Sequence, residues 1–266
     1  MKKMIVFNFF LPILLFTSCV PGLLPNFLMG SGQVISETRA VSNFHTVTLA
    51  GLGDLTIMQG TTEALMITAE DNIMPYIRSG VRDGDLSLGF DPENWRTVPR
   101  TTKPIKFVLT LKKLDALTLA GQGNIDVANL KTVALKLFLT GQGDIRLVQL
   151  EAVDLACTLT GKGNMTVADA KVKQSSCTIT GQGNIDLAGQ LTGQAITITG
   201  QGDYQAGNLD SQAAQVTING MGNVTVWVRE QLDIEVFGKG TVAYYGNPTV
   251  VKNGFGAVEV HALGNK

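Results

Sequence analysis

Few residues in the 266-residue chain could perform acid-base or nucleophilic chemistry. Its two histidines, His45 and His261, are far apart in the sequence, and no nucleophile with an orienting group is recognisable near either. The net charge is −1 and no run of Lys and Arg occurs, which argues against a nucleic-acid partner. The sequence therefore predicts a protein that is not an enzyme and that binds no nucleic acid.

A column of charged residues is the best candidate for an enzymatic alternative. Asp126, Arg146 and Asp186 recur at one place in successive repeats, with Thr166 between them. Polysaccharide lyases and hydrolases place carboxylates and basic residues on one outer face, so cleavage of a polysaccharide is the alternative function. A surface ion pair between Asp126 and Arg146 accounts for the same residues more simply.

Three ring-bearing residues, Trp227, Tyr245 and His261, occupy one place in the last three repeats. Alternation of inward and outward side chains places all three outside. Stacked at strand spacing, they would form an amphipathic platform for a sugar ring or a partner protein. Packing under a loop or in a C-terminal interface is the other interpretation.

Two of the three cysteines, Cys157 and Cys177, also occupy one place in successive repeats, which predicts neighbouring sulfurs inside the core. A disulfide and a pair of buried thiols both remain open. Adjacent parallel strands give an awkward disulfide dihedral, and Leu137 and Ile196 show that the flanking positions are hydrophobic. Buried thiols are therefore favoured.

The third cysteine, Cys19, follows a segment that has the order of an export signal. Residues 1–18 contain two lysines and then an apolar run that is too short to span a bilayer. The sequence Phe16-Thr17-Ser18-Cys19 resembles a bacterial lipobox, which implies lipidation of Cys19, membrane attachment and, since Val20 rather than Asp follows, an outer-membrane lipoprotein. Residues 19–33, rich in Pro and Gly, are expected to form a flexible tether.

A G-x-G motif repeats along the second half of the chain. Its first glycines are Gly121, Gly141, Gly161, Gly181, Gly200, Gly220, Gly238 and Gly254. Apolar residues alternate with polar ones on both sides of each motif, which predicts two short strands per unit. Stacked units of about 20 residues bury a continuous core. The sequence thus predicts an all-β protein, a single-stranded right-handed parallel β-helix, over residues 115–266.

Two polar patterns accompany the repeat. Asn or Asp follows the second glycine in six units, which suits a turn and a stacked ladder better than calcium or saccharide binding. An outward Thr-x-Thr array resembles an ice-binding surface, a minor alternative because Thr also suits any exposed strand and Phe138 interrupts the array. No metal site and no cofactor are predicted. The G-x-G motifs do not indicate a dinucleotide site, because they lack the third glycine and the helix of such a site.

The two ends of the repeat array differ. Residues 34–114 are expected to form a first coil around Gly51 and an irregular cap, with a short helix near 72–79. The last coils shrink to 18 and 16 residues with no segment to cover them. Either the shorter last coils close over the core, or the exposed strands pair with a second copy in an end-to-end homodimer.

The G-x-G-[ND] units, the segment Arg39-Ala40-Val41-Ser42-Asn43-Phe44 and the segment 83–88 together resemble the head GIN domain, a family of bacterial exported proteins described as adhesin heads. The resemblance implies a β-helix and an adhesive role, and it supplies no catalytic residues. The function expected from the sequence is that of a non-enzymatic cell-envelope lipoprotein whose β-helix binds a glycan or a surface partner.

Overall fold

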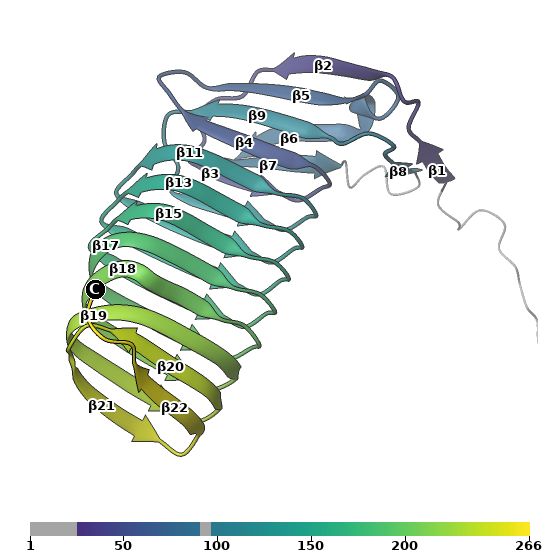
Figure 1. The fold of residues 1–266 in the computed structure, drawn as a ribbon. Helices are drawn as coiled ribbons and strands as arrows, with labels where there is room; N and C mark the ends of the chain where they lie inside the picture. Colours follow the sequence, from purple (N-terminus) through teal and green to yellow (C-terminus); the bar gives the residue numbers. More distant parts are fainter. Residues whose placement is uncertain (1–25, 91–96) are drawn as a thin grey trace, which may run out of the picture.

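A computed structural model describes residues 26–90 and 97–266 of the chain. The fold is a parallel β-helix whose coils stack from the N-terminal to the C-terminal end, as the repeat predicts (Figure 1). The described residues contain strands and a single 3-10 turn, and no α-helix. Residues 1–18 and the first part of the predicted tether, residues 19–25, lie outside the described residues.

Each coil contributes one strand before the G-x-G turn and one after it, and equivalent strands pair in parallel register. The strands before the turn are β3 (Thr46–Leu49), β10 (Ala116–Leu119), β12 (Ala134–Leu139), β14 (Asp154–Leu159) and β16 (Gln174–Ile179). Those after the turn are β4 (Asp54–Gln59), β11 (Ile125–Lys131), β13 (Ile145–Glu151) and β15 (Met165–Lys171). Further along, β17 (Ile185–Ile198), β18 (Tyr204–Ile218) and β19 (Met221–Val236) each continue through the corner between coils, and the array ends in β20 (Lys239–Tyr245), β21 (Thr249–Gly254) and β22 (Ala257–Ala262).

The core consists of ladders of inward side chains. One ladder contains Leu117, Leu137, Cys157, Cys177 and Ile196, all of them buried. Because like positions lie one above another, each apolar side chain is covered by its equivalents in the coils on either side. A unit that could not bury its own face alone is thereby enclosed.

The G-x-G turns need glycine because successive turns approach closely. The second glycines of four turns, at positions 123, 143, 163 and 183, have φ between +130° and +153°. A Cβ on any of them would lie 1.7–1.8 Å from a carbonyl oxygen of the preceding coil. Both the backbone conformation and the spacing therefore exclude a side chain.

A ladder of Asn and Asp side chains joins these turns along the axis. The Oδ1 atom of each accepts a hydrogen bond from the backbone N–H of the equivalent residue in the next coil, at 2.8–3.2 Å. The ladder runs through Asp54, Asn124, Asp144, Asn164, Asn184, Asp203 and Asn223. These residues hold the turns in register, which agrees with the structural role expected for them.

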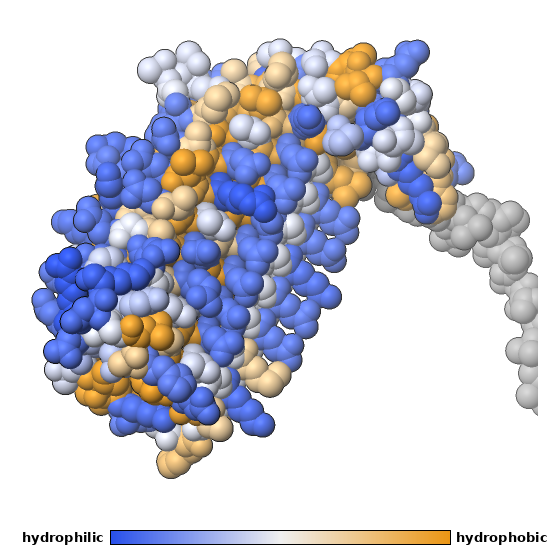
Figure 2. All heavy atoms as spheres, in the orientation of Figure 1, coloured by the Kyte–Doolittle hydropathy of each residue, from blue (hydrophilic) through white to orange (hydrophobic). Residues whose placement is uncertain are grey.

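The N-terminal end is covered by a cap. Its strands are β2 (Val34–Arg39), β5 (Ala64–Glu70), β6 (Ile77–Arg82), β7 (Asp85–Phe90) and β9 (Lys106–Leu111). β7 and β9 stack in parallel on β3 and β4, whereas β5 and β6 pair antiparallel to them and β2 forms the edge. Figure 2 shows hydrophilic side chains in rows along one side of the coils, and apolar ones over the cap, beside those rows and near the C-terminal end.

Two expectations for the N-terminal region are wrong. The predicted helix near 72–79 is only a 3-10 turn, Met74–Tyr76, because the chain from Ile77 pairs with β7 instead. The last part of the predicted tether contains β1 (Asn26–Met29), which pairs in parallel with β8 (Thr97–Arg100).

A buried carboxylate fastens this region to the cap. Glu70, at the end of β5, is 1% exposed and accepts hydrogen bonds from the backbone N–H groups of Gly32 (2.8 Å) and Thr102 (2.8 Å) and from the Thr102 hydroxyl (2.5 Å). The Thr102 hydroxyl contributes most to lowering the pKa of Glu70 from 4.5 to about 2.

The last coil differs in register from the prediction. β22 pairs with β20 so that Lys239 faces Ala257, which makes Gly256, and not Gly254, the equivalent of Gly238. The final step is therefore 18 residues rather than 16. In this register Lys252 faces Ile234 on the inward ladder, and its ammonium donates to the Val258 carbonyl across the coil at 2.9 Å.

Candidate contact surfaces of the β-helix

Two of the three ring-bearing residues predicted to stack near the C-terminus lie side by side. Trp227 of β19 and Tyr245 of β20 face each other in parallel register, so their side chains neighbour one another on the outside of the last coils. Both are half-buried. The Tyr245 ring lies over Gly207, where a Cβ would come within 3.2 Å of the ring.

The final residues of the chain return over this pair, which the sequence did not predict. The Leu263 N–H donates to the Tyr244 carbonyl at 2.8 Å, and the Gly246 N–H donates to the Gly264 carbonyl at 2.9 Å. The Lys266 ammonium then lies 4.5 Å from the centroid of the Tyr245 ring and 5.7 Å from that of Trp227. This is the range of cation–π contacts. The pair is thus a cluster of two rings and a cation.

His261 does not belong to the stack. The shifted register of the last coil places it opposite Ala243, two residues along the strand from Tyr245. The prediction of three stacked rings is therefore wrong in this respect. The exposed His261 ring instead approaches Glu259, with its Nε2 atom 3.2 Å from a carboxylate oxygen.

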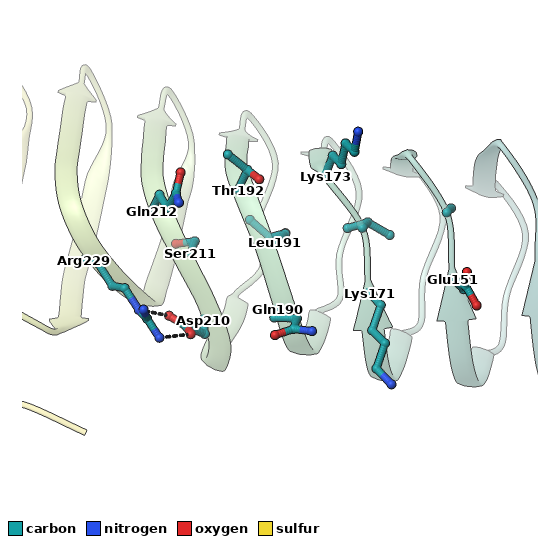
Figure 3. A pocket seen from close by; sticks show the side chains of 12 residues that line it. Glu151, Lys171, Lys173, Gln190, Leu191, Thr192, Asp210, Ser211, Gln212 and Arg229 are labelled. Atoms are coloured by element: carbon teal, nitrogen blue, oxygen red, sulfur yellow. Dashed lines mark hydrogen bonds and ion pairs between the residues drawn. The ribbon is translucent and has the colours of Figure 1, made fainter.

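A groove follows the corner where the chain passes from one coil to the next. It has a volume of about 520 Å³ and, as Figure 3 shows, two rows of polar side chains with smaller ones between them. The row nearer the second strands consists of Glu151, Lys171, Gln190 and Asp210, and the other row contains Lys173, Thr192 and Gln212. Leu191 and Ser211 lie between the two rows (Figure 3) and form the floor. Ala152 and Val172 precede and follow wall residues of the other coils and also line the groove. We call this the corner groove.

The corner groove continues toward the cap. A second hollow of about 530 Å³ shares Glu151 and Lys171 with it and extends to Gln59 and Lys112. Carboxamide side chains recur along both hollows, at Gln59, Asn129, Gln149, Gln190 and Gln212. Sequence reasoning missed this surface, because its walls come from the ends of the second strands and the corners that follow, where no single residue type repeats.

The outward threonines form the expected ladder. Thr158, Thr178, Thr197 and Thr217 face one another in register on four successive coils. Phe138 and Glu235 end this ladder on either side. The threonine face is therefore regular but short.

The charged column lacks the geometry of a glycosidase. Asp126, Arg146, Thr166 and Asp186 do face one another in register. However, Arg146 forms its ion pair with Asp144, so the predicted pair with Asp126 is wrong. At ~4.8 Å per coil, Asp126 and Asp186 are roughly 14 Å apart, whereas paired glycosidase carboxylates are about 5–9.5 Å apart.

The paired cysteines are free thiols in the core. Cys157 and Cys177 face each other, and each is 1% exposed. The neighbouring Cys177 thiol and burial raise the pKa of Cys157 well above 9. Such thiols are inert toward solvent reagents.

A buried polar chain lies beside the thiols and was not predicted. The Tyr204 hydroxyl donates to Gln194 at 2.9 Å, Gln194 donates to the Ser211 hydroxyl at 2.8 Å, and Ser211 donates to the Trp227 carbonyl at 2.6 Å. Burial raises the pKa of Tyr204, which keeps the phenol neutral. This series of hydrogen bonds ends at the Trp227 carbonyl and so connects the core to the aromatic pair.

The described residues include no cluster of three or more His, Cys, Asp or Glu side chains with the spacing of a metal site. Among the same residues, no helix is long and apolar enough to cross a bilayer.

Comparison with known proteins identifies the family. The model of a family described as "Putative auto-transporter adhesin, head GIN domain" matches residues 43–248. The chain belongs to this family. The resemblance seen in the G-x-G-[ND] units is thereby confirmed. No curated protein sequence matches this head GIN domain protein.

Solved structures share the fold of this head GIN domain. A "putative lipid binding protein" from Parabacteroides distasonis is 21% identical over 90% of this chain and 100% of its own, with a TM-score of 0.83. A "putative adhesin" from Parabacteroides merdae is 23% identical over 90% and 99%, with a TM-score of 0.82. Another from Bacteroides fragilis is 23% identical over 89% and 100%, with a TM-score of 0.68. At these identities the likeness concerns the fold.

Proposed function

We propose that the protein is an exported, non-enzymatic, adhesin-like component of the cell envelope that binds a glycan or a surface protein. The observation that carries this proposal is the cluster of Trp227, Tyr245 and Lys266 at the C-terminal end of the coils. Aromatic rings with an adjacent cation offer apolar and charged contact in one place. The family description and the adhesin descriptions of two solved relatives support the same function.

Lys266 covers part of this contact surface before any partner binds. Its ammonium lies against both rings, and it also donates to the Gly207 carbonyl at 2.6 Å. A sugar that stacks on the rings must displace this cation, whereas an acidic partner gains from it. His261 lies beside the cluster and contributes at its margin.

Binding to a glycan array and to host or bacterial cells tests the proposal. Trp227→Ala and Tyr245→Ala are expected to abolish the binding that the wild-type protein shows, and Phe138→Ala, which removes an outward ring elsewhere, is expected to retain it. Thermal unfolding verifies that each variant folds. Unchanged binding by a folded Trp227→Ala variant would refute the contact assignment.

Attachment to the membrane is proposed through a lipid on Cys19, which lies outside the described residues. An outer-membrane lipoprotein with a processed N-terminus fits the order of residues 1–19. Membrane fractionation of Cys19→Ser in the native host is the test. Release of the variant into the soluble fraction is expected, and its retention in the membrane would exclude the anchor.

A further inference from the structure

The corner groove has the features of a ligand site. Its lining shares no side chain with the cluster of Trp227, Tyr245 and Lys266. Its volume of about 520 Å³ is within the range of small-molecule sites. The hollow that adjoins it adds about 530 Å³ along the same direction. The two together form a trough that follows the axis of the β-helix rather than a closed pocket.

The floor of the corner groove is partly apolar. Val172 is 7% exposed and Leu191 is 8% exposed, so their methyl groups reach the bottom of the groove without forming an open apolar patch. On either side, Gln190, Thr192 and Gln212 extend polar groups along the walls (Figure 3). An apolar floor between amide and hydroxyl groups matches the C–H face and the hydroxyl rim of a sugar ring.

The charges of the groove favour an anion. Lys171 and Lys173 lie on opposite walls of one coil (Figure 3). Val172 separates them in the sequence and lines the same groove. Lys171 is 3.9 Å from Asp169, at the limit of an ion pair, and Lys173 forms no ion pair within the described part of the chain. The acidic wall residues are already paired, Glu151 with Lys131 at 2.6 Å and Asp210 with Arg229.

We propose that the corner groove binds an acidic polysaccharide in an extended conformation, parallel to the axis of the β-helix. An acid group of the ligand lies between Lys171 and Lys173, a ring face covers Val172 and Leu191, and ring hydroxyls bond the carboxamides. The step of ~4.8 Å between coils places equivalent groups at intervals close to the length of one pyranose unit.

An acidic peptide suits the groove less well. Peptides that bind along strands gain affinity from unpaired backbone groups at a sheet edge. Here the backbone is already bonded between coils, with Thr192 N–H donating to the Lys173 carbonyl at 3.0 Å and Lys173 N–H donating to the Val153 carbonyl at 2.9 Å. The groove therefore recognises its ligand through side chains, of which several are carboxamides.

Calorimetric titration of the full chain with hexagalacturonate tests the proposal. The double variant Lys171→Glu/Lys173→Glu is expected to bind at least about tenfold more weakly than the wild-type protein. Lys136→Glu/Lys239→Glu changes the net charge equally at exposed positions outside the groove and is expected to bind as the wild-type does. Gln190→Ala/Gln212→Ala, which removes no charge, is expected to weaken binding severalfold.

Three results would overturn the proposal: no titratable binding of hexagalacturonate, an equal loss in the two charge-reversal variants, or equal affinity for hexaglutamate. The last would identify a site for negative charge of any kind. Trp227→Ala is expected to leave hexagalacturonate binding unchanged. A loss in that variant would locate the ligand at the aromatic cluster and so remove the groove proposal while supporting the proposed function.

Discussion

At the scale of single residues, two kinds of position fix each turn of the β-helix. The second glycine of the turn admits no side chain, because the neighbouring carbonyl oxygen occupies the space. The Asn or Asp that follows it bonds the next coil. The sequence revealed both positions, since each recurs with the repeat and each requires one narrow class of residue.

Gly143→Ala is expected to destabilise the protein by about 3 kcal/mol or more, because it adds both an unfavourable φ and a backbone clash. Its φ is +130°, and the new Cβ would lie 1.8 Å from the Gly123 carbonyl oxygen. Chemical denaturation followed by circular dichroism measures the change. Gly80→Ala is the control, since no heavy atom lies within 4 Å of its added Cβ, and it should stay within ~0.5 kcal/mol of the wild-type protein.

Asn184→Ala is expected to cost about 1 kcal/mol, because the Asp203 N–H loses the acceptor that it reaches at 3.0 Å. Asn184→Asp keeps an acceptor oxygen and should retain most of the stability. The same denaturation experiment compares the two variants. Equal stability of Asn184→Ala and the wild-type protein would show that water replaces the ladder bond at this position.

At the scale of elements, the strands were predictable and the connections between them were not. Alternation of apolar residues gave the inward ladders because the period of a strand is two. The cap was located but not its strand pairing, since antiparallel partners such as β2 and β5 share no repeated motif. The last coil was misaligned because Gly254-Phe255-Gly256 reads as a G-x-G motif that begins at Gly254, whereas the strand pairing makes Gly256 the equivalent of the first glycine.

The hydrogen bonds of Glu70 to the segments that follow β1 and β8 make the free energy of unfolding depend on pH. A lowered pKa in the folded state means that the carboxylate contributes stability above pH 4.5 and that this contribution is lost as the pH falls toward 2. Thermal unfolding between pH 7 and 2 should show this loss. Glu70→Gln is expected to be less stable at pH 7 and to depend less on pH between 4.5 and 2; parallel curves for the two proteins would contradict the assignment.

At the scale of the whole molecule, the stack has two unlike ends. The N-terminal end is covered by antiparallel strands, and the C-terminal end stops at a coil whose inward ladder terminates in Lys252. An inward-pointing charge on an edge strand opposes pairing with another chain. We therefore expect an unpaired C-terminal end rather than the end-to-end homodimer, which the sequence leaves as an alternative.

Lys252→Ile is expected to promote association through the C-terminal coil, since it continues the apolar ladder above Ile234 and removes the bond to the Val258 carbonyl. Sedimentation velocity over a range of protein concentrations measures the effect. The wild-type protein and Lys136→Ile, an apolar substitution on the long side of the coils, should remain monomeric. A wild-type dimer under these conditions would show that the end-to-end contact forms despite the lysine.

Lys252 also bears on how far copies of the protein could associate. Because the N-terminal end is covered by antiparallel strands, contact through the C-terminal coils could join copies only in pairs. We expect the ammonium group at the end of the inward ladder to oppose this pairing as well. Each molecule would then remain a separate binding unit, with its proposed groove and aromatic cluster open to a partner.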